Sequence, residues 1–225
     1  MKAAFRLIFC LAASLAHATE VQQHGLSFEH WVADTFFGGY RGTGPTDKWD
    51  IPASANRNHG CIPVNPKATQ YGEPVLLGDA VRQYDINQPF LLVVGFWEQD
   101  GRGKKFVQSL VARIEPDQWR KLWGPVTRAD LESMDKLIKD TSRPVAETRK
   151  DVLRRKKQPP FSQAVIQLNP KIDKSQRRLQ CSISYVRLFK NLAPGRDRKA
   201  RPFPEIFGRR IPSLDESPSR RLPRR

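Results

Sequence analysis

Residues 90–97 read FLLVVGFW, an unbroken run of apolar residues. A run of this length and composition predicts a strand that is buried on both faces. Residues 106–114, FVQSLVARI, predict a second strand, and the intervening residues 98–104 predict the turn of a hairpin. The chain is therefore expected to fold around a sheet with an interior strand at residues 90–97.

The segment before this hairpin is expected to supply a helix and two extended stretches. Residues 26–37 carry apolar residues at helical spacing, with Ser27 as the N-cap. Residues 40–52 become extended after a glycine-rich start, and residues 61–68 form a strand. Two prolines within the second stretch favour an irregular strand or one at the edge of a sheet.

Further helices and strands are predicted along the rest of the body. Their mixed order along the chain predicts a single domain of the α/β (α+β) class. The predicted helices span residues 77–84, 116–123, 128–139 and 145–156, and the predicted strands span residues 163–168 and 178–186.

The charge of the chain indicates a polyanionic partner. The 225 residues include 39 Lys and Arg against 23 Asp and Glu, a formal net charge of +16. Residues 195–225 hold ten basic and four acidic residues, so six of these charges lie there and ten in the rest. The body is thus basic by itself, which favours nucleic acid or an anionic membrane surface. The alternative is a soluble protein that is simply basic.

Both ends of the chain are expected to lie outside the folded body. Residues 1–18 resemble a secretory signal, with two early basic residues, an apolar stretch at residues 7–16 and an A-x-A site. If this signal is genuine the protein is exported or periplasmic; if the true start lies near Glu20, it is cytoplasmic. Residues 193–225 alternate Pro, Arg and Ser, which predicts a disordered basic tail. No stretch is apolar and long enough to span a membrane.

Cysteine and histidine patterns exclude the common transition-metal sites. The three cysteines show no CxxC spacing, and the four histidines form no HExxH or HxH pattern. Cys61 and Cys181 are expected to be small buried thiols. A disulfide between them, in an oxidising compartment, stays open as the alternative.

Asp50, Asn65 and Lys67 have the spacing expected of a metal-dependent phosphodiesterase. Hydrolysis of a phosphodiester needs a hard cation held by carboxylates, and a nearby lysine can stabilise charge or orient the attacking water. Residues i and i+2 share one face of a strand, so Asn65 and Lys67 can point at one centre. Asp50 lies on the preceding extended segment, which a short loop allows to run antiparallel beside them, and Glu29 can reach the same cleft.

These residues resemble the PD-(D/E)xK nuclease superfamily. The resemblance covers residues 25–97, about a third of the chain, and implies a restriction-endonuclease-like core with a central mixed sheet flanked by helices. It also implies a magnesium ion, a nucleic-acid substrate and a nuclease-like domain over residues 20–192. The matching pieces are FEHWV at 28–32, KWDIP at 48–52, VNPKA at 64–68, GDAVRQ at 78–83 and the apolar run at 90–97.

The resemblance assigns catalytic roles to Asp50, Lys67 and Glu29, and metal binding to Asp50 and Asn65. The sequence departs from the pattern at Asn65, where Glu, Asp or Gln is expected. An amide oxygen brings no charge, so the affinity for magnesium should fall. Glu29, Glu73 or Asp79 would then supply the missing carboxylate.

Structural roles compete with these assignments. Asp50 can cap a turn, and Lys67 can be a solvated strand residue. Glu29 can be an ordinary carboxylate near a helix N-terminus, where the dipole favours negative charge. Asp79 can be the N-cap of the helix that follows it.

Two polar clusters are candidates for contacts with nucleic acid. Arginine pairs with guanine and glutamine with adenine in the major groove, and both can contact phosphates. Either cluster can instead be a solvated surface. The candidates are Gln176, Arg177, Arg178 and Gln180 before the last predicted strand, and Arg154 and Arg155 at the end of a predicted helix.

The sequence therefore predicts a magnesium-dependent DNA endonuclease of the restriction type. A homodimer is an open alternative to a monomer, because enzymes that cut both DNA strands are often dimers. Two other functions compete with cleavage. One is a nucleic-acid-binding module whose nuclease site has decayed at Asn65, and the other is an exported basic protein that binds the cell envelope.

Overall fold

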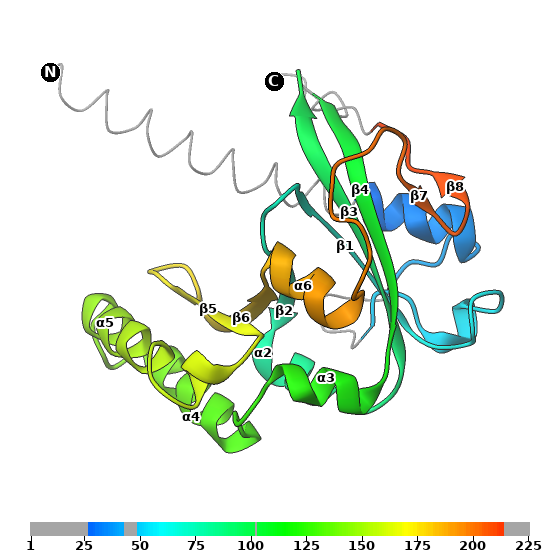
Figure 1. Cartoon of the computed structure of the whole chain (residues 1–225). Helices are drawn as coiled ribbons and strands as arrows, with labels where there is room; N and C mark the ends of the chain where they lie inside the picture. The colour runs from blue at the N-terminus through cyan, green and yellow to red at the C-terminus, as the bar shows by residue number, and fades with distance from the viewer. Residues whose placement is uncertain (1–26, 43–48, 102, 214–225) are drawn as a thin grey trace, which may run out of the picture.

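The computed structural model describes residues 27–42, 49–101 and 103–213. The expected mixed α/β architecture is confirmed, with a mixed sheet flanked by helices. Two three-stranded sheets, in the orders β1-β3-β4 and β2-β6-β5, lie next to each other (Figure 1). The segments 1–18 and 214–225, for which a signal and part of a tail were predicted, lie outside the described residues.

The first sheet is built around the apolar run. β3 (Phe90–Asp100) pairs in parallel with β1 (Val64–Gln70) and antiparallel with β4 (Gly103–Ile114), so the predicted hairpin is confirmed. Alternate residues of β3 enter two different cores, with Leu92 facing one and Leu91 the other. A strand with neighbours on both sides and a core on each face must be apolar throughout, which explains the sequence of residues 90–97.

One face of this sheet is covered by the helix that includes residues 27–36. Phe28 and Val32 of this helix are fully buried, and the Phe28 ring stacks on Phe106 of β4 at 5.2 Å between centroids. Gly95 of β3 allows this approach, because a Cβ there would lie 2.6 Å from ring carbons of both phenylalanines. The predicted amphipathic helix is confirmed, and its packing fixes Glu29 beside the sheet.

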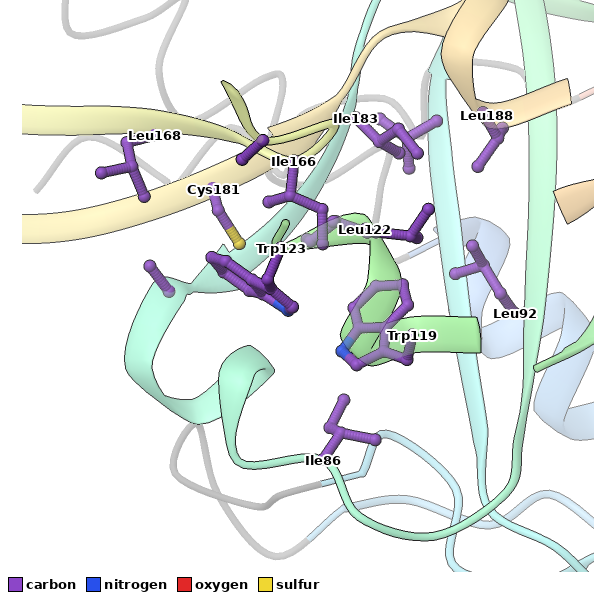
Figure 2. Close-up of a cluster of buried hydrophobic side chains, with 14 of the residues drawn as sticks. Ile86, Leu92, Trp119, Leu122, Trp123, Ile166, Leu168, Cys181, Ile183 and Leu188 are labelled. Carbon is purple, nitrogen blue, oxygen red and sulfur yellow. The ribbon is translucent and has the colours of Figure 1, made fainter. Parts of the chain in front are cut away.

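The larger core lies between the two sheets and the helices below them (Figure 1). Trp119 and Trp123 of the segment around α3 (Pro116–Leu122) fill its centre, as Figure 2 shows. The indole of Trp119 donates a hydrogen bond of 2.7 Å to the backbone oxygen of Gln83, so its only polar atom is satisfied.

The second sheet contains β2 (Val75–Asp79), β6 (Arg177–Ile183) and β5 (Gln167–Ile172), all antiparallel. α4 (Arg128–Lys139) and α5 (Val145–Lys156) contact it and have the predicted bounds. Other short helices are α2 (Ala80–Tyr84), η1 (Ala53–Ala55) and η2 (Phe161–Gln163).

Three sequence-based predictions in this region are wrong. Residues 77–84 are not one helix, because β2 continues to Asp79 and Gly78 has a φ of +97° that a helix does not allow. The strand predicted at 163–168 begins at Gln167. The strand predicted at 178–186 ends at Ile183, and α6 (Tyr185–Leu192) follows it. Apolar residues at i, i+3, i+4 and i+7 of α6 carried a helical signal that was missed.

Residues 193–213 pack against the body, so the prediction of a disordered tail is wrong for this part. Ser109 of β4 donates a hydrogen bond of 2.7 Å to the backbone oxygen of Glu205, and Ile206 is fully buried. The segment ends in a small hairpin of β7 (Glu205–Ile206) and β8 (Arg209–Arg210). Its few apolar residues lack periodicity, so no local pattern indicated a folded segment. They are buried because the segment packs on β4, which is the edge strand of its sheet.

Ile206→Ala is expected to lower the free energy of unfolding by about 2–5 kcal/mol, because it removes fully buried methyl groups from the smaller core. Urea denaturation of the purified protein measures this loss. Val186→Ala is the control, since Val186 is 54% exposed and its truncation should change little. Equal stability of the Ile206 variant and the wild type would restore the view of this segment as a dispensable tail.

The two described cysteines are free, so no disulfide joins them. Cys181 is buried, as predicted, and its burial raises the pKa of the thiol. Cys61 is exposed, which differs from the buried position expected for it. Among the described residues, no helix has the length and apolar character needed to cross a membrane.

Candidate active site

Asp50 and Lys67 are brought together by one short antiparallel contact. The backbones of Ile51 and Val64 exchange two hydrogen bonds, of 3.1 and 2.8 Å. This bridge aligns the Asp50 segment with the start of β1, as the sequence predicts. Lys67 lies three residues beyond Val64 on β1, and its ammonium group makes an ion pair with Oδ2 of Asp50.

Asn65 helps to hold this alignment. Its side chain is nearly buried, with 5% of the residue exposed, and its Oδ1 accepts a hydrogen bond of 3.3 Å from the backbone N–H of Asp50. The predicted metal ligand therefore has a structural partner within the site. The second lone pair of Oδ1 is not used by this bond, so the amide oxygen keeps some capacity to bind a cation.

Glu29 completes a cluster of three charged side chains. Its Oε1 lies 3.9 Å from Nζ of Lys67, so the lysine is placed between two carboxylates. All three side chains are partly buried: the exposed fraction is 31% for Glu29, 36% for Asp50 and 20% for Lys67. Lys67 is thus no freely solvated strand residue, and Glu29 is no ordinary surface carboxylate.

Burial raises the pKa of Glu29 from 4.5 to about 7; the positive charge of Lys67 opposes this shift and the negative charge of Asp50 adds to it. A carboxyl group of this kind is easily protonated near neutral pH when no further cation is present. Perturbed groups of this kind concentrate at functional sites, although ion-pair networks also produce them.

The raised pKa predicts a pH-dependent effect of Glu29→Gln on stability. In the wild type, folding favours the protonated acid, so this group destabilises the fold as pH rises from about 4.5 through about 7. Glutamine carries no such penalty. In EDTA, the variant should therefore match the wild type near pH 4.5 and exceed it at pH 8 by at most about 3 kcal/mol, less after solvent screening.

Urea denaturation of both proteins at the two pH values measures this difference. Other titrating groups are common to both proteins and cancel in the comparison. A difference between variant and wild type that stays the same at both pH values would show that Glu29 does not titrate in this way.

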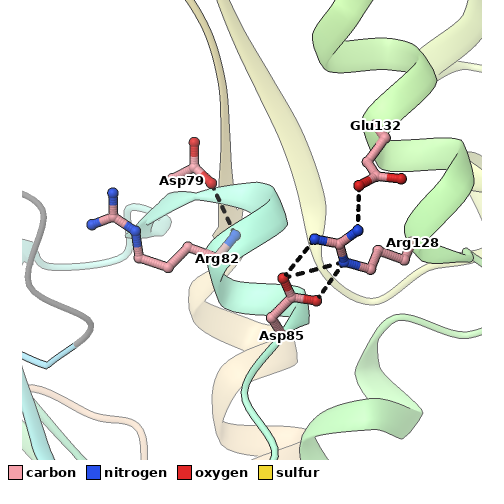
Figure 3. A network of polar contacts seen from close by, with 5 residues as sticks. All are labelled: Asp79, Arg82, Asp85, Arg128 and Glu132. Carbon is pink, nitrogen blue, oxygen red and sulfur yellow. Dashed lines mark hydrogen bonds and ion pairs between the residues drawn. The ribbon is translucent and has the colours of Figure 1, made fainter.

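The cluster opens into a cavity of about 730 Å³ that is lined by residues of both sheets. Asp79 lines the same cavity, whereas Glu73 lines a different one, so Glu73 does not supply the missing carboxylate. Oδ1 of Asp79 accepts a hydrogen bond of 2.9 Å from the backbone N–H of Arg82 and caps α2, as Figure 3 shows. Asp79 therefore has the N-cap role that the sequence offered as its alternative.

Asp50 and Glu29 are the carboxylates that can hold a divalent cation beside Lys67. Within the described part of the chain, no three Asp, Glu, His or Cys residues converge on one point as a ready-made metal site. A hard cation bound here would take two carboxylates, and complete its shell with an amide oxygen, water or substrate oxygens. Magnesium binds proteins in this way, through one or two carboxylates plus substrate phosphates.

The predicted nucleic-acid-binding residues of β6 divide into two groups. Arg178 and Gln180 line the cavity with Asp50 and Lys67. Arg177 instead points into the body, where its guanidinium donates to the backbone oxygens of Ile138, Asp140 and Arg143 and closes the C-terminal end of α4.

Gln176 belongs to the turn before β6. Its amide donates to the Asp173 carboxylate at 3.0 Å, and its oxygen accepts from the Arg178 guanidinium at 2.6 Å. These contacts anchor the turn and orient Arg178. They give Gln176 a supporting position rather than one in the lining of the cavity.

The basic end of α5 does not reach the candidate site. Arg154 makes an ion pair of 2.9 Å with Asp151 of its own helix. Arg155 lines a separate cavity along α2 and α4. A charged network borders that cavity, in which Arg128 contacts both Asp85 and Glu132 (Figure 3).

Two arginines in the lining of the candidate-site cavity were not predicted from the sequence. Arg82 lies in the first turn of α2, three residues after the cap Asp79, and this spacing could have indicated that the two share a site. Arg41 makes an ion pair of 2.8 Å with Asp34 and follows a glycine-rich stretch without periodicity. No local signal distinguished it.

Comparisons of this chain with family models, with curated proteins and with solved structures found no match. The function is therefore inferred from the residues and the geometry of the site. The strongest feature for that inference is the meeting of Glu29, Asp50 and Lys67 at one cavity.

Proposed function

We propose that this protein is a magnesium-dependent DNA endonuclease of the PD-(D/E)xK type, acting as a restriction enzyme. The observation that carries this proposal is the placement of Lys67 between Asp50 and Glu29 in one cavity. These residues come from a helix, an extended segment and a strand that are separate in sequence. Their convergence is what a metal-assisted phosphodiesterase requires.

The order of the elements supports a restriction-endonuclease-like core. The helix at residues 27–36 precedes the antiparallel contact that carries Asp50, and β1 then presents Lys67. α2 follows, and β3 returns parallel to β1 beside the site. This is the order that the resemblance to the superfamily implies.

The charges that line the cavity fit an anionic substrate. Lys67 and three arginines face Glu29, Asp50 and Asp79, so basic residues exceed acidic ones even before a cation is bound. A bound divalent ion would add to the positive charge of the cavity and allow a phosphate to approach the carboxylates. The arginines of the lining are Arg41, Arg82 and Arg178.

Each residue of the cluster has a distinct part in the proposed reaction. Magnesium supplies Lewis-acid activation of the phosphate and of the attacking water when it is bound. Asp50 and Glu29 hold the ion, and Asn65 fixes the backbone of Asp50 through its hydrogen bond. Lys67 places a positive charge where negative charge develops on the phosphate, which stabilises the transition state electrostatically.

Plasmid digestion tests the proposal. Purified full-length protein is incubated with supercoiled plasmid in magnesium, and in the same buffer with EDTA. We expect nicked and linear products only with magnesium, and none with Asp50→Ala in a parallel preparation. Equal digestion by the Asp50 variant would point to a contaminating nuclease and would remove the support for this site.

Asn65→Asp is expected to lower the magnesium concentration needed for half-maximal cleavage. The new carboxylate keeps an oxygen that can accept the backbone N–H of Asp50, and it adds the charge that the amide lacks. Titration of cleavage against magnesium measures the effect. Asn65→Ala is the control, because it should lose the backbone contact without adding a ligand. An unchanged magnesium requirement in the aspartate variant would exclude residue 65 from the metal site.

A second function, nucleic-acid binding without cleavage, is favoured by one observation. Oδ1 of Asn65 is engaged by the backbone of Asp50, and this residue brings no negative charge. A site with two carboxylates and a neutral third position can bind metal too weakly to act. Such a protein would bind duplex DNA in a gel-shift assay with calcium but leave plasmid intact at any magnesium concentration.

A further inference from the structure

One face of the hairpin formed by β5 and β6 carries only basic, amide and hydroxyl side chains. Cross-strand neighbours on this face are Lys171 and Arg178, then Asn169 and Gln180, then Gln167 and Ser182. Two basic residues thus lie at one end, followed by amides and a hydroxyl. We call these six residues the polar strip.

The opposite face of the hairpin belongs to the core. Leu168, Leu179 and Cys181 are buried there in the larger core, and the hairpin contacts α4 through β6 and α5 through β5. An antiparallel sheet with one covered face normally has a polar outer face. The six residues of the polar strip include no carboxylate, although Asp79 of β2 lies beside Gln180 in the same sheet. The strip is rich in the amide and guanidinium groups that read base edges.

The polar strip extends directly from the candidate active site. Arg178 and Gln180 line the cavity of Lys67. The remaining members of the strip line a second cavity of about 630 Å³, together with residues of β1 that follow Lys67. Both cavities therefore lie along the same two strands. These remaining members are Gln167, Asn169, Lys171 and Ser182.

Two members of the strip are arranged for recognition. The amide of Asn169 donates a hydrogen bond of 2.6 Å to the Ser182 hydroxyl, which fixes its orientation and leaves its oxygen available. Within the described part of the chain, the side-chain amide of Gln180 makes no hydrogen bond and is half-buried. A half-buried amide in the lining of a cavity has already lost part of its hydration, so pairing with a ligand costs it little further desolvation.

Lys156 of α5 supplies a cation at the far end of the strip. It lines the second cavity, and burial lowers the pKa of its ammonium group. No carboxylate among the described residues makes an ion pair with it. Glu73 also lines this cavity but makes no ion pair with Lys156. A partly desolvated ammonium group that is not ion-paired favours an anion such as a backbone phosphate.

We propose that the polar strip reads the base sequence of DNA from the major groove next to the site of cleavage. Asn169 and Gln180 would pair with adenine and Arg178 with guanine, while Lys171 and Lys156 contact phosphates. A major groove about 12 Å wide admits two strands, and β5 is the edge strand beside β6, whose other neighbour is β2. The strip runs roughly 13 Å along β6 at about 3.3 Å per residue, which corresponds to about four base-pair steps. This inference rests on the proposed function for the identity of the nucleic acid and for the nearby site of cleavage, but not for the reading of bases.

Selection from a library of randomised DNA duplexes tests the polar strip separately from catalysis. Full-length wild type, Asn169→Ala, Gln180→Ala and Gln158→Ala each select bound duplexes in calcium, and the enriched sequences are determined. Gln158→Ala is the matched control, since this glutamine is exposed and lines neither cavity. The wild type and the control should enrich one shared motif.

Loss of Asn169 or Gln180 should relax the motif at one position each, with discrimination falling between about fivefold and about 150-fold. Lys171→Ala should weaken binding to all duplexes alike. If the wild type enriches no motif, or if both amide variants enrich the wild-type motif unchanged, the polar strip does not read sequence. A motif that relaxes as expected in a protein that never cuts plasmid would instead reject the nuclease and retain the strip.

Discussion

Asp50→Asn is expected to reduce DNA cleavage by at least about 100-fold at saturating magnesium. The substitution keeps the size of the side chain but removes the carboxylate that pairs with Lys67. Because Asn65 is already neutral, only Glu29 would remain as an anionic ligand of the cluster. A bound metal supplies several kcal/mol of charge stabilisation, and each loss of about 1.4 kcal/mol slows the reaction tenfold.

Binding separates a catalytic role of Asp50 from a structural one. A carboxylate repels phosphates when no metal lies between them, so Asp50→Asn should bind duplex DNA in EDTA as tightly as the wild type or more tightly. Lys67→Ala should also lose cleavage, and it should bind somewhat more weakly through one lost phosphate contact. Initial rates of plasmid cleavage and gel-shift titrations measure both effects. Cleavage by Asp50→Asn at the wild-type rate would assign Asp50 a structural role and would contradict the proposal that this cluster is the catalytic site.

Trp119→Ala is expected to cost about 3–5 kcal/mol of the free energy of unfolding, which is a large part of the stability of a typical domain. The side chain is 1% exposed and packs edge-on against Phe90 of the central strand, with ring centroids 5.2 Å apart. Its loss also leaves the backbone oxygen of Gln83 without its indole partner. Guanidinium denaturation followed by circular dichroism measures the change.

Two further tryptophan variants separate the contributions to this loss. Trp119→Phe retains most of the apolar volume but removes the hydrogen bond to Gln83, so it should cost less than the alanine variant. Trp31→Ala is the matched control, because Trp31 is only partly buried and packs at the smaller core. A loss at Trp119 no greater than at Trp31 would show that the centre of the larger core lies elsewhere.

The local sequence pattern was sufficient to predict an element that is stabilised by its neighbours in sequence or is buried throughout. The run at residues 90–97 became the central strand β3, and the amphipathic segments at 128–139 and 145–156 became α4 and α5. A capping box joins the side chain and backbone of Thr127 with those of Asp130, so four consecutive residues are enough to define the start of α4. Such signals need no knowledge of the rest of the molecule.

Part of the candidate site was also accessible from sequence. Asn65 and Lys67 are two residues apart on a strand, and this spacing alone requires them to share a face. Their meeting with Asp50 followed from a short connection between two extended segments, and the bridge of Ile51 and Val64 has this form. The contact of Glu29 with Lys67 spans 38 positions and depended on which face of the first helix would cover the sheet.

The sequence by itself determined the apolar strand, the long helices and the pairing of Asp50 with Lys67, because each depends on the periodicity of side chains or on a short connection. The tertiary structure alone decided that residues 75–79 form a strand, since β2 takes its hydrogen bonds from β6, about a hundred residues later in the chain. It likewise decided that Ile206 is buried against β4 and that Gln180 shares a cavity with Lys67. In each case the deciding contact lies with a segment distant in sequence, and the free energy of that contact does not appear in any local pattern.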